Sequence, residues 1–375
     1  MINIVFVVRN DFYEKFGGDT HQIDQYISCN DDSDILLSTI TLSQFINLKH
    51  YEKFDCYILT NIDRASDFVQ MGMVCKKNEL FSKTLILPIH HSHVAMNKFN
   101  KLRFPLFWPF IELFGGTLFI EKIKGIYRDI LSKKYFIAFN SFFINYKKHI
   151  ASTLSSSLGF ICIANGEYKN ILKDFEVEDK RYFIVRNGVS FIPKQQFQDK
   201  NIKDRVYDVI VCGRVEERKN QIAILDALQG SNLRILFLGG VNKFNKKYAK
   251  NFFDRIERNP QITHIDQVKP EDVLEFYGNS KVSLSASWFE VSSLADIEAA
   301  SCGCFVFSSI NGHSEEIINA NQIKLIDPEK LNSLDVMIRD AINYWKAKPV
   351  TQIVSYTWKD SSRELISGLK RIIIK

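Results

Sequence analysis

Two glutamates and a predicted helix start stand close together between residues 281 and 316 of this 375-residue chain. An apolar alternating run from Val282 to Ala286 predicts a strand, and Glu290 follows it. Seven residues separate Glu290 from Glu298, which lies in a run of helix formers that begins at Leu294. Free N–H groups at a helix start attract phosphate, and carboxylates bind hydroxyl groups through charge-assisted hydrogen bonds. This combination suits a sugar nucleotide.

Basic residues follow an earlier predicted strand in the same half of the chain. The run Tyr207 to Cys212 predicts that strand, and Gly213 bends the chain after it. Arg214 and Lys219 then lie five positions apart, just before a helix predicted over residues 221–228. Two cations in such a place can clamp a diphosphate. Two basic residues in a loop are usually only solvated, so this pattern alone does not identify a site.

Either glutamate alone would be read as an ordinary solvated residue. Together, the spacing of Glu290 and Glu298, the alanine-rich run ending at Gly303 and the Gly213-Arg214…Lys219-Asn220 pattern resemble the C-terminal domain of the retaining glycosyltransferases of family 4. The resemblance implies an α/β protein of the GT-B type, with two Rossmann-like doubly wound domains facing across a cleft. The chain departs from the family at the turn, where the usual glycines and proline are replaced by Val291, Ser293 and Ala295.

The resemblance also implies a role for each matching residue. Arg214 and Lys219, after the bend at Gly213, would neutralise the diphosphate leaving group. Glu298 would accept hydrogen bonds from the ribose hydroxyls, and Glu290 would lie near the hydroxyls of the donor sugar. By the same resemblance, Val268 would belong to a segment that lines the base pocket. The distal phosphate would be held by backbone N–H groups of the turn, in Ser292, Ser293 and Leu294.

In the first half, two glycines follow the first predicted strand. The apolar run Ile2 to Val8 predicts that strand, and Gly17 and Gly18 precede a predicted helix. Glycines let backbone N–H groups approach a phosphate closely, and ligands gather at the carboxyl ends of parallel strands. We therefore expect Gly17 and Gly18 to bind the substrate.

Three histidines end a strand predicted over residues 84–89. They are His90, His91 and His93, and no carboxylate or cysteine close to them in the sequence supports a zinc site. The resemblance places a histidine at this strand end, beside the anomeric centre of the donor sugar. His90 fits that place best, and His91 is the alternative. The resemblance further implies catalysis without a metal or a cofactor.

A densely aromatic run occupies Phe104 to Ile120. Its prolines and glycines exclude one straight spanning helix. Aromatic residues with basic flanks suit a segment that rests on anionic lipid, and a core loop with charged edges fits the pattern equally well. The hypothesis of membrane contact therefore concerns residues 98–124, with the basic residues Lys98, Lys101, Arg103, Lys122 and Lys124.

The composition is that of a globular protein, with 46% hydrophobic and 25% charged residues. The net charge of +6 is modest, and no nucleic-acid-binding signature accompanies it, so nucleic acid is not an expected partner. Seven scattered cysteines in mostly apolar runs predict reduced thiols. We expect a cytoplasmic protein, with the inner face of the membrane as a candidate place of peripheral attachment.

Strand–helix alternation runs through the first half and restarts near residue 206. We expect an acceptor-side domain over residues 1–190, a linker over 191–205 and a nucleotide-sugar-binding domain over 206–355. The resemblance places the last helix, within residues 356–375, back on the first domain. Another strand is predicted over residues 135–141.

The implied reaction moves a sugar, with retention, from a UDP- or GDP-linked donor to a saccharide or lipid-linked oligosaccharide acceptor. By analogy, this reaction would serve O-antigen or capsule synthesis. Two alternatives stay open. A sugar-nucleotide epimerase shares the architecture and needs no acceptor, and a catalytically silent protein of the same fold would only bind or scaffold.

Overall fold

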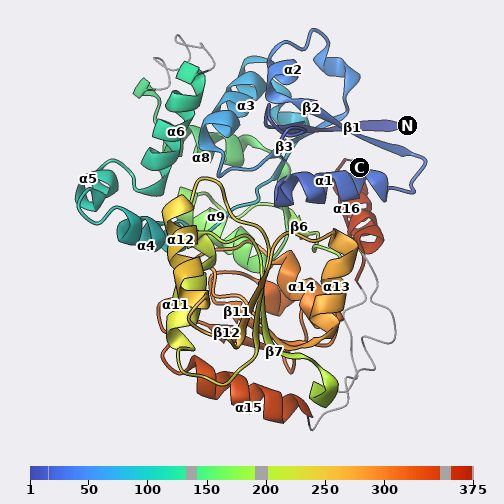
Figure 1. Ribbon diagram of the computed structural model, residues 1–375. Helices are drawn as coiled ribbons and strands as arrows, with labels where there is room; N and C mark the ends of the chain where they lie inside the picture. The colour runs from blue at the N-terminus through green and yellow to red at the C-terminus, as the bar shows by residue number, and fades with distance from the viewer. Residues whose placement is uncertain (16, 132–141, 191–201, 347–355, 374–375) are drawn as a thin grey trace. The chain divides into compact units, whose positions relative to one another are not determined.

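The computed structural model describes residues 1–15, 17–131, 142–190, 202–346 and 356–373 (Figure 1). The chain divides into unit 1, residues 1–187 and 358–375, and unit 2, residues 188–357. Each unit holds one six-stranded sheet with helices between successive strands. The strand predicted over residues 135–141 lies outside the described residues.

The sheet of unit 1 is parallel and has the strand order β2-β1-β3-β4-β5-β6. Its inner strands are continuous runs of buried apolar residues, as expected where helices cover both faces of a parallel sheet. The strands are β1 (Ile2–Val8), β2 (Ile35–Thr41), β3 (Cys56–Thr60), β4 (Thr84–Leu87), β5 (Gly159–Cys162) and β6 (Tyr182–Ile184).

The last helix of the chain, α16 (Trp358–Ile373), belongs to unit 1 and packs on α1 (Gly18–Ser28). The Trp358 ring is buried, with its centroid 6.0 Å from that of Tyr26, and Ser362 Oγ donates a hydrogen bond to the Tyr26 carbonyl (2.9 Å). The other helices of this unit are α2 (Leu42–Ile46), α3 (Ala65–Lys77), α4 (His93–Arg103), α5 (Trp108–Leu113), α6 (Thr117–Leu131), α8 (Tyr146–Ser156) and α9 (Asn165–Phe175), with the 3₁₀ turns η1 (Tyr51–Lys53) and η2 (Leu80–Lys83).

The sheet of unit 2 is parallel and has the strand order β12-β11-β10-β7-β8-β9. Neighbouring residues of one strand face opposite sides, so Val209 and Val211 join one buried cluster while Ile210 joins another. The strands are β7 (Tyr207–Cys212), β8 (Ile235–Leu238), β9 (Ile262–Ile265), β10 (Ser280–Leu284), β11 (Phe305–Ser309) and β12 (Ile323–Ile326).

Helices cover both faces of this second sheet. The short 3₁₀ turn η3 precedes its first strand, β7, in the chain. In the predicted linker, residues 191–201 lie outside the described residues, whereas Arg205 is buried and donates to the carbonyls of Ser280 (2.7 Å) and Cys302 (3.0 Å). The end of that segment is therefore part of unit 2. The helices are α11 (Gln221–Ala227), α12 (Lys246–Ile256), α13 (Pro270–Gly278), α14 (Leu294–Ser301) and α15 (Leu334–Lys346), with η3 (Ile202–Asp204), η4 (Glu217–Lys219) and η5 (Ser314–Glu316).

Candidate functional site

The predicted donor-side residues lie at the carboxyl edge of the unit 2 sheet. β7 and β10 are paired neighbours, so the segments that follow them leave the sheet at the same edge. Gly213 and Arg214 directly follow β7, and Glu290 follows β10. This is the edge at which open α/β sheets bind ligands.

Two glycines allow a very close approach of backbone at this edge. Gly213 has φ +144° and Gly239, after β8, has φ +138°. A Cβ atom on Gly239 would lie only 2.5 Å from the Gly213 carbonyl oxygen, and one on Gly213 would lie 3.3 Å from Lys219 Cε. The two strand ends can therefore meet only because neither residue carries a side chain.

Lys219 and Glu290 meet in an ion cluster although 71 positions separate them. Lys219 Nζ lies 2.5 Å from Glu290 Oε1, and Arg218 Nη1 lies 2.9 Å from the same oxygen. Arg218 also pairs with Glu216 (3.1 Å). Arg218 and Glu216 were not predicted from the sequence. The run of charged residues 216–219 is the pattern that could have indicated them. The cluster neutralises Glu290 and holds Lys219 at the strand end.

Arg214 is the exposed cation of this edge. Its side chain is 64% exposed, and its Nε lies 4.0 Å from Glu216 Oε2. At that distance the contact is a weak electrostatic one. The guanidinium can therefore turn towards an anionic ligand at little cost.

The turn before α14 carries the predicted phosphate-binding N–H groups. Ser293 caps the helix, since its hydroxyl accepts a hydrogen bond from the Asp296 N–H (3.3 Å). The neighbouring Ser292 Oγ is buried and has no hydrogen-bond partner among the described residues. Leu294, the first residue of α14, is partly buried. The turn thus combines a helix start with an unused hydroxyl group.

Glu298 lies inside α14 and is partly buried. Its carboxylate accepts no hydrogen bond from the described residues, and burial raises its pKa to about 7. Burial also raises the pKa of the Cys212 thiol to about 11, and the negative charge of Glu298 adds to this effect. Cys212 directly precedes Gly213, so the charge of Glu298 is felt at the end of β7.

Asp296 is a buried carboxylate that the sequence reasoning missed. Its Oδ2 accepts hydrogen bonds from the hydroxyls of Ser308 (2.5 Å) and Ser314 (2.9 Å), while Oδ1 has no partner among the described residues. Burial raises its pKa to about 6. The residue ties the start of α14 to β11 and η5. Its hydrogen-bond partners lie 12 and 18 positions further along the chain, so no local sequence pattern predicts the role of Asp296.

Val268 follows β9 and is partly buried against one of the two buried clusters of unit 2. Asp266, before it, is exposed, and its Oδ1 accepts a hydrogen bond from the Gln267 N–H (2.8 Å). β9 ends at Ile265, so Val268 lies in the segment that follows this strand. The base-pocket role of Val268 stays a prediction.

In unit 1, the predicted glycines form the start of α1. Gly17 is its N-cap and Gly18 its first residue. A Cβ atom on Gly18 would meet nothing within 4 Å, so space is open there. Asp19 in the first turn is held by the buried Arg9, whose Nε lies 3.0 Å from Asp19 Oδ2.

The histidines after β4 are surrounded by carboxylates. His90 is buried, with Nδ1 2.6 Å from Asp63 Oδ1 and Nε2 3.1 Å from Asp174 Oδ2. Burial would lower its pKa, but the two aspartates outweigh that effect and raise the pKa to about 9. The expectation that no carboxylate supports this cluster is therefore wrong. Asp63 and Asp174 are 27 and 84 positions away in sequence.

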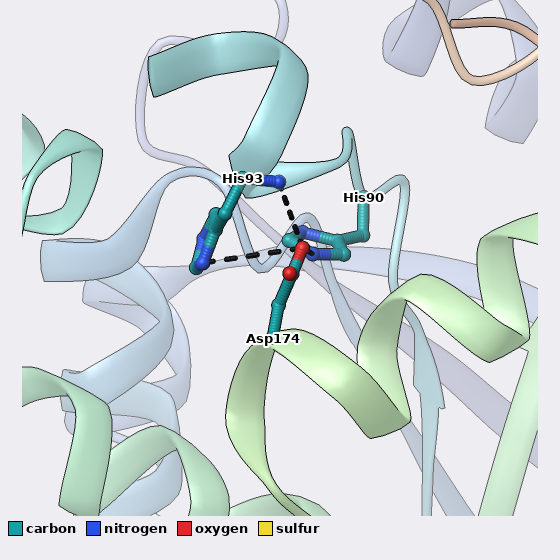
Figure 2. Close-up of side chains that lie close together, drawn as sticks. All are labelled: His90, His93 and Asp174. Atoms are coloured by element: carbon teal, nitrogen blue, oxygen red, sulfur yellow. Dashed lines mark hydrogen bonds and ion pairs between the residues drawn. The ribbon is translucent and has the colours of Figure 1, made fainter. Parts of the chain in front are cut away.

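His91 is the more accessible of the two histidines considered for catalysis. Its side chain is 23% exposed, and its Nδ1 lies 2.6 Å from Asp63 Oδ2. His93, at the start of α4, donates its backbone N–H to Asp174 Oδ2 (2.7 Å). Figure 2 shows the His90 and His93 rings converging on the Asp174 carboxylate.

The aromatic run of unit 1 forms α5, the turns on either side of it and the first residues of α6 (Figure 1, teal). Leu106 is 89% exposed and Phe107 is 67% exposed, whereas Trp108 is buried. Most of the run is therefore not a core loop. Further exposed apolar side chains on α4 to α6 and their connections are Leu102, Phe110, Leu113, Phe114, Ile123, Tyr127, Ile130 and Leu131.

The basic residues beside this run differ in their surroundings. Lys122 Nζ donates to the carbonyls of Phe142 (2.6 Å) and Ile144 (3.0 Å), so its ammonium group is already engaged within unit 1. Those with exposed side chains are Lys98, Lys101, Arg103 and Lys124. Within the described parts of the chain, no helix combines the length and the apolar character needed to cross a bilayer.

Comparison with known proteins identifies the fold and the second unit. The chain is similar in structure to sucrose-phosphate synthase from Thermosynechococcus elongatus (TM-score 0.65, 11% identity). The alignment covers 100% of this chain and 97% of the synthase chain. The chain also resembles Anabaena Alr3699/HepE solved with UDP and glucose (0.64, 11%, covering 99% and 100% of the two chains). The lipopolysaccharide outer core galactosyltransferase WaaB is similar as well (0.64, 13%, 99% of both chains). At the sequence level, no curated protein matches the chain.

The fold prediction is confirmed by these likenesses, which at such low identity concern the fold alone. Residues 193–349, which include the ion cluster and α14, match the family described as glycosyl transferases group 1. Nearly all of unit 2 is therefore similar to glycosyl transferases group 1, in a chain that has the GT-B fold.

Proposed function

We propose that this chain is a retaining glycosyltransferase that moves a sugar from a nucleoside-diphosphate sugar to a saccharide or lipid-linked acceptor. Bacterial surface polysaccharide, such as O-antigen or capsule, is the product class we propose. One observation carries the proposal. At the carboxyl edge of the unit 2 sheet, the Lys219–Glu290 pair is linked through Arg218 and Glu216 to the exposed Arg214, and α14, which begins after β10 at this edge, carries a Glu298 carboxylate that binds no described residue.

The charges at this edge suit the leaving group of the reaction. When the bond between the anomeric carbon and the diphosphate oxygen breaks, negative charge grows on the diphosphate. Arg214 and Lys219 stabilise that charge, and one such preorganised contact is worth roughly 10²–10³ in turnover. These cations supply the charge that a metal ion provides in other phosphate sites, so the transfer itself is proposed to need no metal.

Arg218 allows Lys219 to leave Glu290 and bind the diphosphate. In the structure both cations bind Glu290 Oε1. When a diphosphate arrives, Lys219 can turn to it while Arg218 still neutralises the glutamate. Glu290 can then accept hydrogen bonds from hydroxyls of the donor sugar.

The ribose and the base are assigned to neighbouring groups. Glu298 accepts hydrogen bonds from the ribose hydroxyls, the turn at Ser292 and Ser293 holds the distal phosphate, and Val268 lines the base pocket. A uridine donor is the first choice, because Alr3699/HepE, which shares the fold, was solved with UDP and with UDP-glucose. In unit 1, we assign His91 rather than His90 as the histidine beside the anomeric centre of the donor sugar, because the His90 ring is enclosed by two aspartates.

The experiment is incubation of the purified chain with UDP- and GDP-sugars, with and without saccharide acceptors, followed by mass spectrometry. A glycosylated acceptor whose new linkage keeps the anomeric configuration of the donor supports the proposal. An isomerised sugar nucleotide without an acceptor would identify the epimerase. Nucleotide binding without turnover on any acceptor would favour the silent protein.

We also propose that the exposed apolar side chains of residues 98–131 rest on an anionic membrane surface. The exposed Leu106 and Phe107 would enter the interface, and four exposed basic residues would bind the headgroups. Each basic residue contributes about 1 kcal/mol near such a surface, so binding should be reversible and sensitive to salt.

Vesicle co-sedimentation tests this contact. Replacing Lys98, Lys101, Arg103 and Lys124 together by Gln should release the protein from anionic vesicles, while transfer to a soluble acceptor continues. The matched control removes equal charge from exposed lysines at and before α12, by replacing Lys243, Lys246, Lys247 and Lys250 with Gln. Equal loss in both variants, or no binding by the unaltered protein, would refute the membrane contact.

A further inference from the structure

The cluster of His90, His93 and Asp174 has the composition of a metal site, and the reaction proposed above does not use it. The three residues offer one ligand atom each, and these atoms all lie within 4.8 Å of one another. They come from the loop after β4, the start of α4 and the end of α9 (Figure 2). We propose that they bind one divalent first-row metal ion, with zinc as the best fit, and that this ion ties the three segments together.

The distances fit a single ion. Zinc lies about 2.0–2.2 Å from nitrogen and oxygen ligands, so its tetrahedral ligands are about 3.3 Å apart. Asp174 Oδ2 lies 3.1 Å from His90 Nε2 and 4.0 Å from His93 Nδ1. All three ligand atoms lie within 4.8 Å of one another, so shifts of about 1–1.5 Å at most would bring each pair to that spacing. Water can supply the fourth ligand, because the His93 side chain is 16% exposed.

His93 distinguishes this proposal from a simple buried ion pair. A charged His90 held between Asp63 and Asp174 would explain the positions of those three residues. The His93 ring packs edge-on against Phe175, but this leaves its Nδ1 unused, because 4.0 Å from Nδ1 to the carboxylate is too long for a hydrogen bond. Neither ring nitrogen of His93 bonds to another described residue. A metal ion accounts for this unused nitrogen beside a carboxylate.

Asp63 supplies the support that metal-binding histidines usually have. Its Oδ1 lies 2.6 Å from His90 Nδ1, so a proton on Nδ1 leaves the lone pair of Nε2 directed at the cluster. The charges also balance, since two carboxylates and two neutral imidazoles would carry no net charge with a divalent ion. Two imidazoles favour zinc or a similar transition metal over magnesium or calcium. The ion would also fix the loop that carries His91.

The first test measures zinc bound by the full chain, purified without a histidine tag. The free zinc concentration is set by a competing chromophoric chelator, and bound metal is counted by mass spectrometry. We expect one zinc ion per chain in the unaltered protein. His93→Phe keeps a ring against Phe175 but offers no nitrogen, so it should lose the ion. Asp63→Asn keeps all three ligands and should weaken binding by roughly 10–100-fold.

The control is His50→Gln, because His50 also pairs with a carboxylate, that of Glu52 (2.8 Å), but lies on the exposed surface. It should bind zinc like the unaltered protein. Zinc should raise the melting temperature of the unaltered chain and of this control, and leave that of His93→Phe unchanged.

The visible spectrum of bound cobalt tests the site in the unaltered chain, so this test does not depend on the folding of a variant. Cobalt bound to the unaltered chain should show visible bands of a nitrogen and oxygen site, with no thiolate charge-transfer band. A thiolate band would assign the metal to cysteines and overturn the proposal. Zinc uptake no greater in the unaltered chain than in His93→Phe would overturn it as well, leaving His90 as a charged side chain between two aspartates.

Discussion

Replacing Glu298 by Gln should make the protein more stable and a poorer binder of nucleotide. Burial raises the pKa of this carboxyl group from 4.5 to about 7, so the folded protein disfavours its charged form. A raised carboxyl pKa contributes stability in full below about pH 4.5, and this stability is lost as the pH rises through about 7. The glutamine variant carries no such charge, so its advantage should appear only as the pH rises.

The size of this effect follows from the shift. A pKa rise from 4.5 to about 7 corresponds to about 3 kcal/mol. Because the side chain is only partly buried, water screens part of the charge, and we expect about 1–2 kcal/mol at pH 8. For a protein of this size, the melting temperature should rise by roughly 1–3 °C at pH 8 and stay unchanged at pH 4.5.

Nucleotide binding should change in the opposite direction. Hydrogen bonds to a charged acceptor are worth about 1 kcal/mol more each than those to a neutral one. The two ribose hydroxyls should therefore bind the Glu298 carboxylate more tightly than the amide that replaces it, and the variant should bind UDP roughly 5–30-fold more weakly. Binding should also favour the carboxylate, so calorimetry near pH 7 in two buffers of different ionisation enthalpy should detect proton release by the unaltered protein only.

A matched control is Glu275→Gln, because Glu275 is an exposed glutamate on α13 of the same unit. It should alter neither melting nor UDP affinity. If Glu298→Gln behaves like this control, Glu298 is an ordinary helix residue and its place in the donor site is refuted.

Further substitutions test the same edge and the first glycines. Lys219→Met and Arg214→Ala should each lower turnover by roughly 10²–10³ with the fold intact, and near-normal initial rates in both would remove them from the leaving-group site. Gly239→Ala should lower the melting temperature, since its Cβ would clash with the Gly213 carbonyl oxygen, and an unchanged melting curve would contradict that contact. Gly18→Ala meets open space and should melt normally, so lost transfer activity would report a ligand close to this backbone.

The meeting of these residues at one edge of the unit 2 sheet could be predicted, because the proposed donor chemistry demands particular residues at strand ends. A diphosphate needs cations and a ribose needs acceptors, and in a parallel sheet these follow strands that are recognisable as apolar runs. Lys219 and Glu290 are expected in one site for this reason, and the structure joins them at 2.5 Å. The sequence could not show that Arg218 shares the same oxygen, since that depends on how the charged run folds.

The histidine cluster shows why unit 1 was harder to predict. Local sequence around His90 contains no carboxylate, yet Asp63 reaches it from the loop after β3 and Asp174 from α9. Only the packing of three separate segments brings these groups together. Residues close to His90 in the sequence therefore do not predict the cluster. The same limit applies to Asp296, whose serine partners lie on later elements.

The resting ion cluster explains how a site can hold two carboxylates and still accept an anionic ligand. A partly buried glutamate left without a cation would cost several kcal/mol, which would oppose any movement of Lys219. Here the Glu290 oxygen has a second cation, Arg218, at 2.9 Å. In the proposed reaction, Lys219 can therefore exchange the glutamate for a diphosphate without leaving a buried charge unpaired. The two adjacent cations are thus not redundant: Arg218 keeps Glu290 neutralised so that Lys219 can serve the ligand.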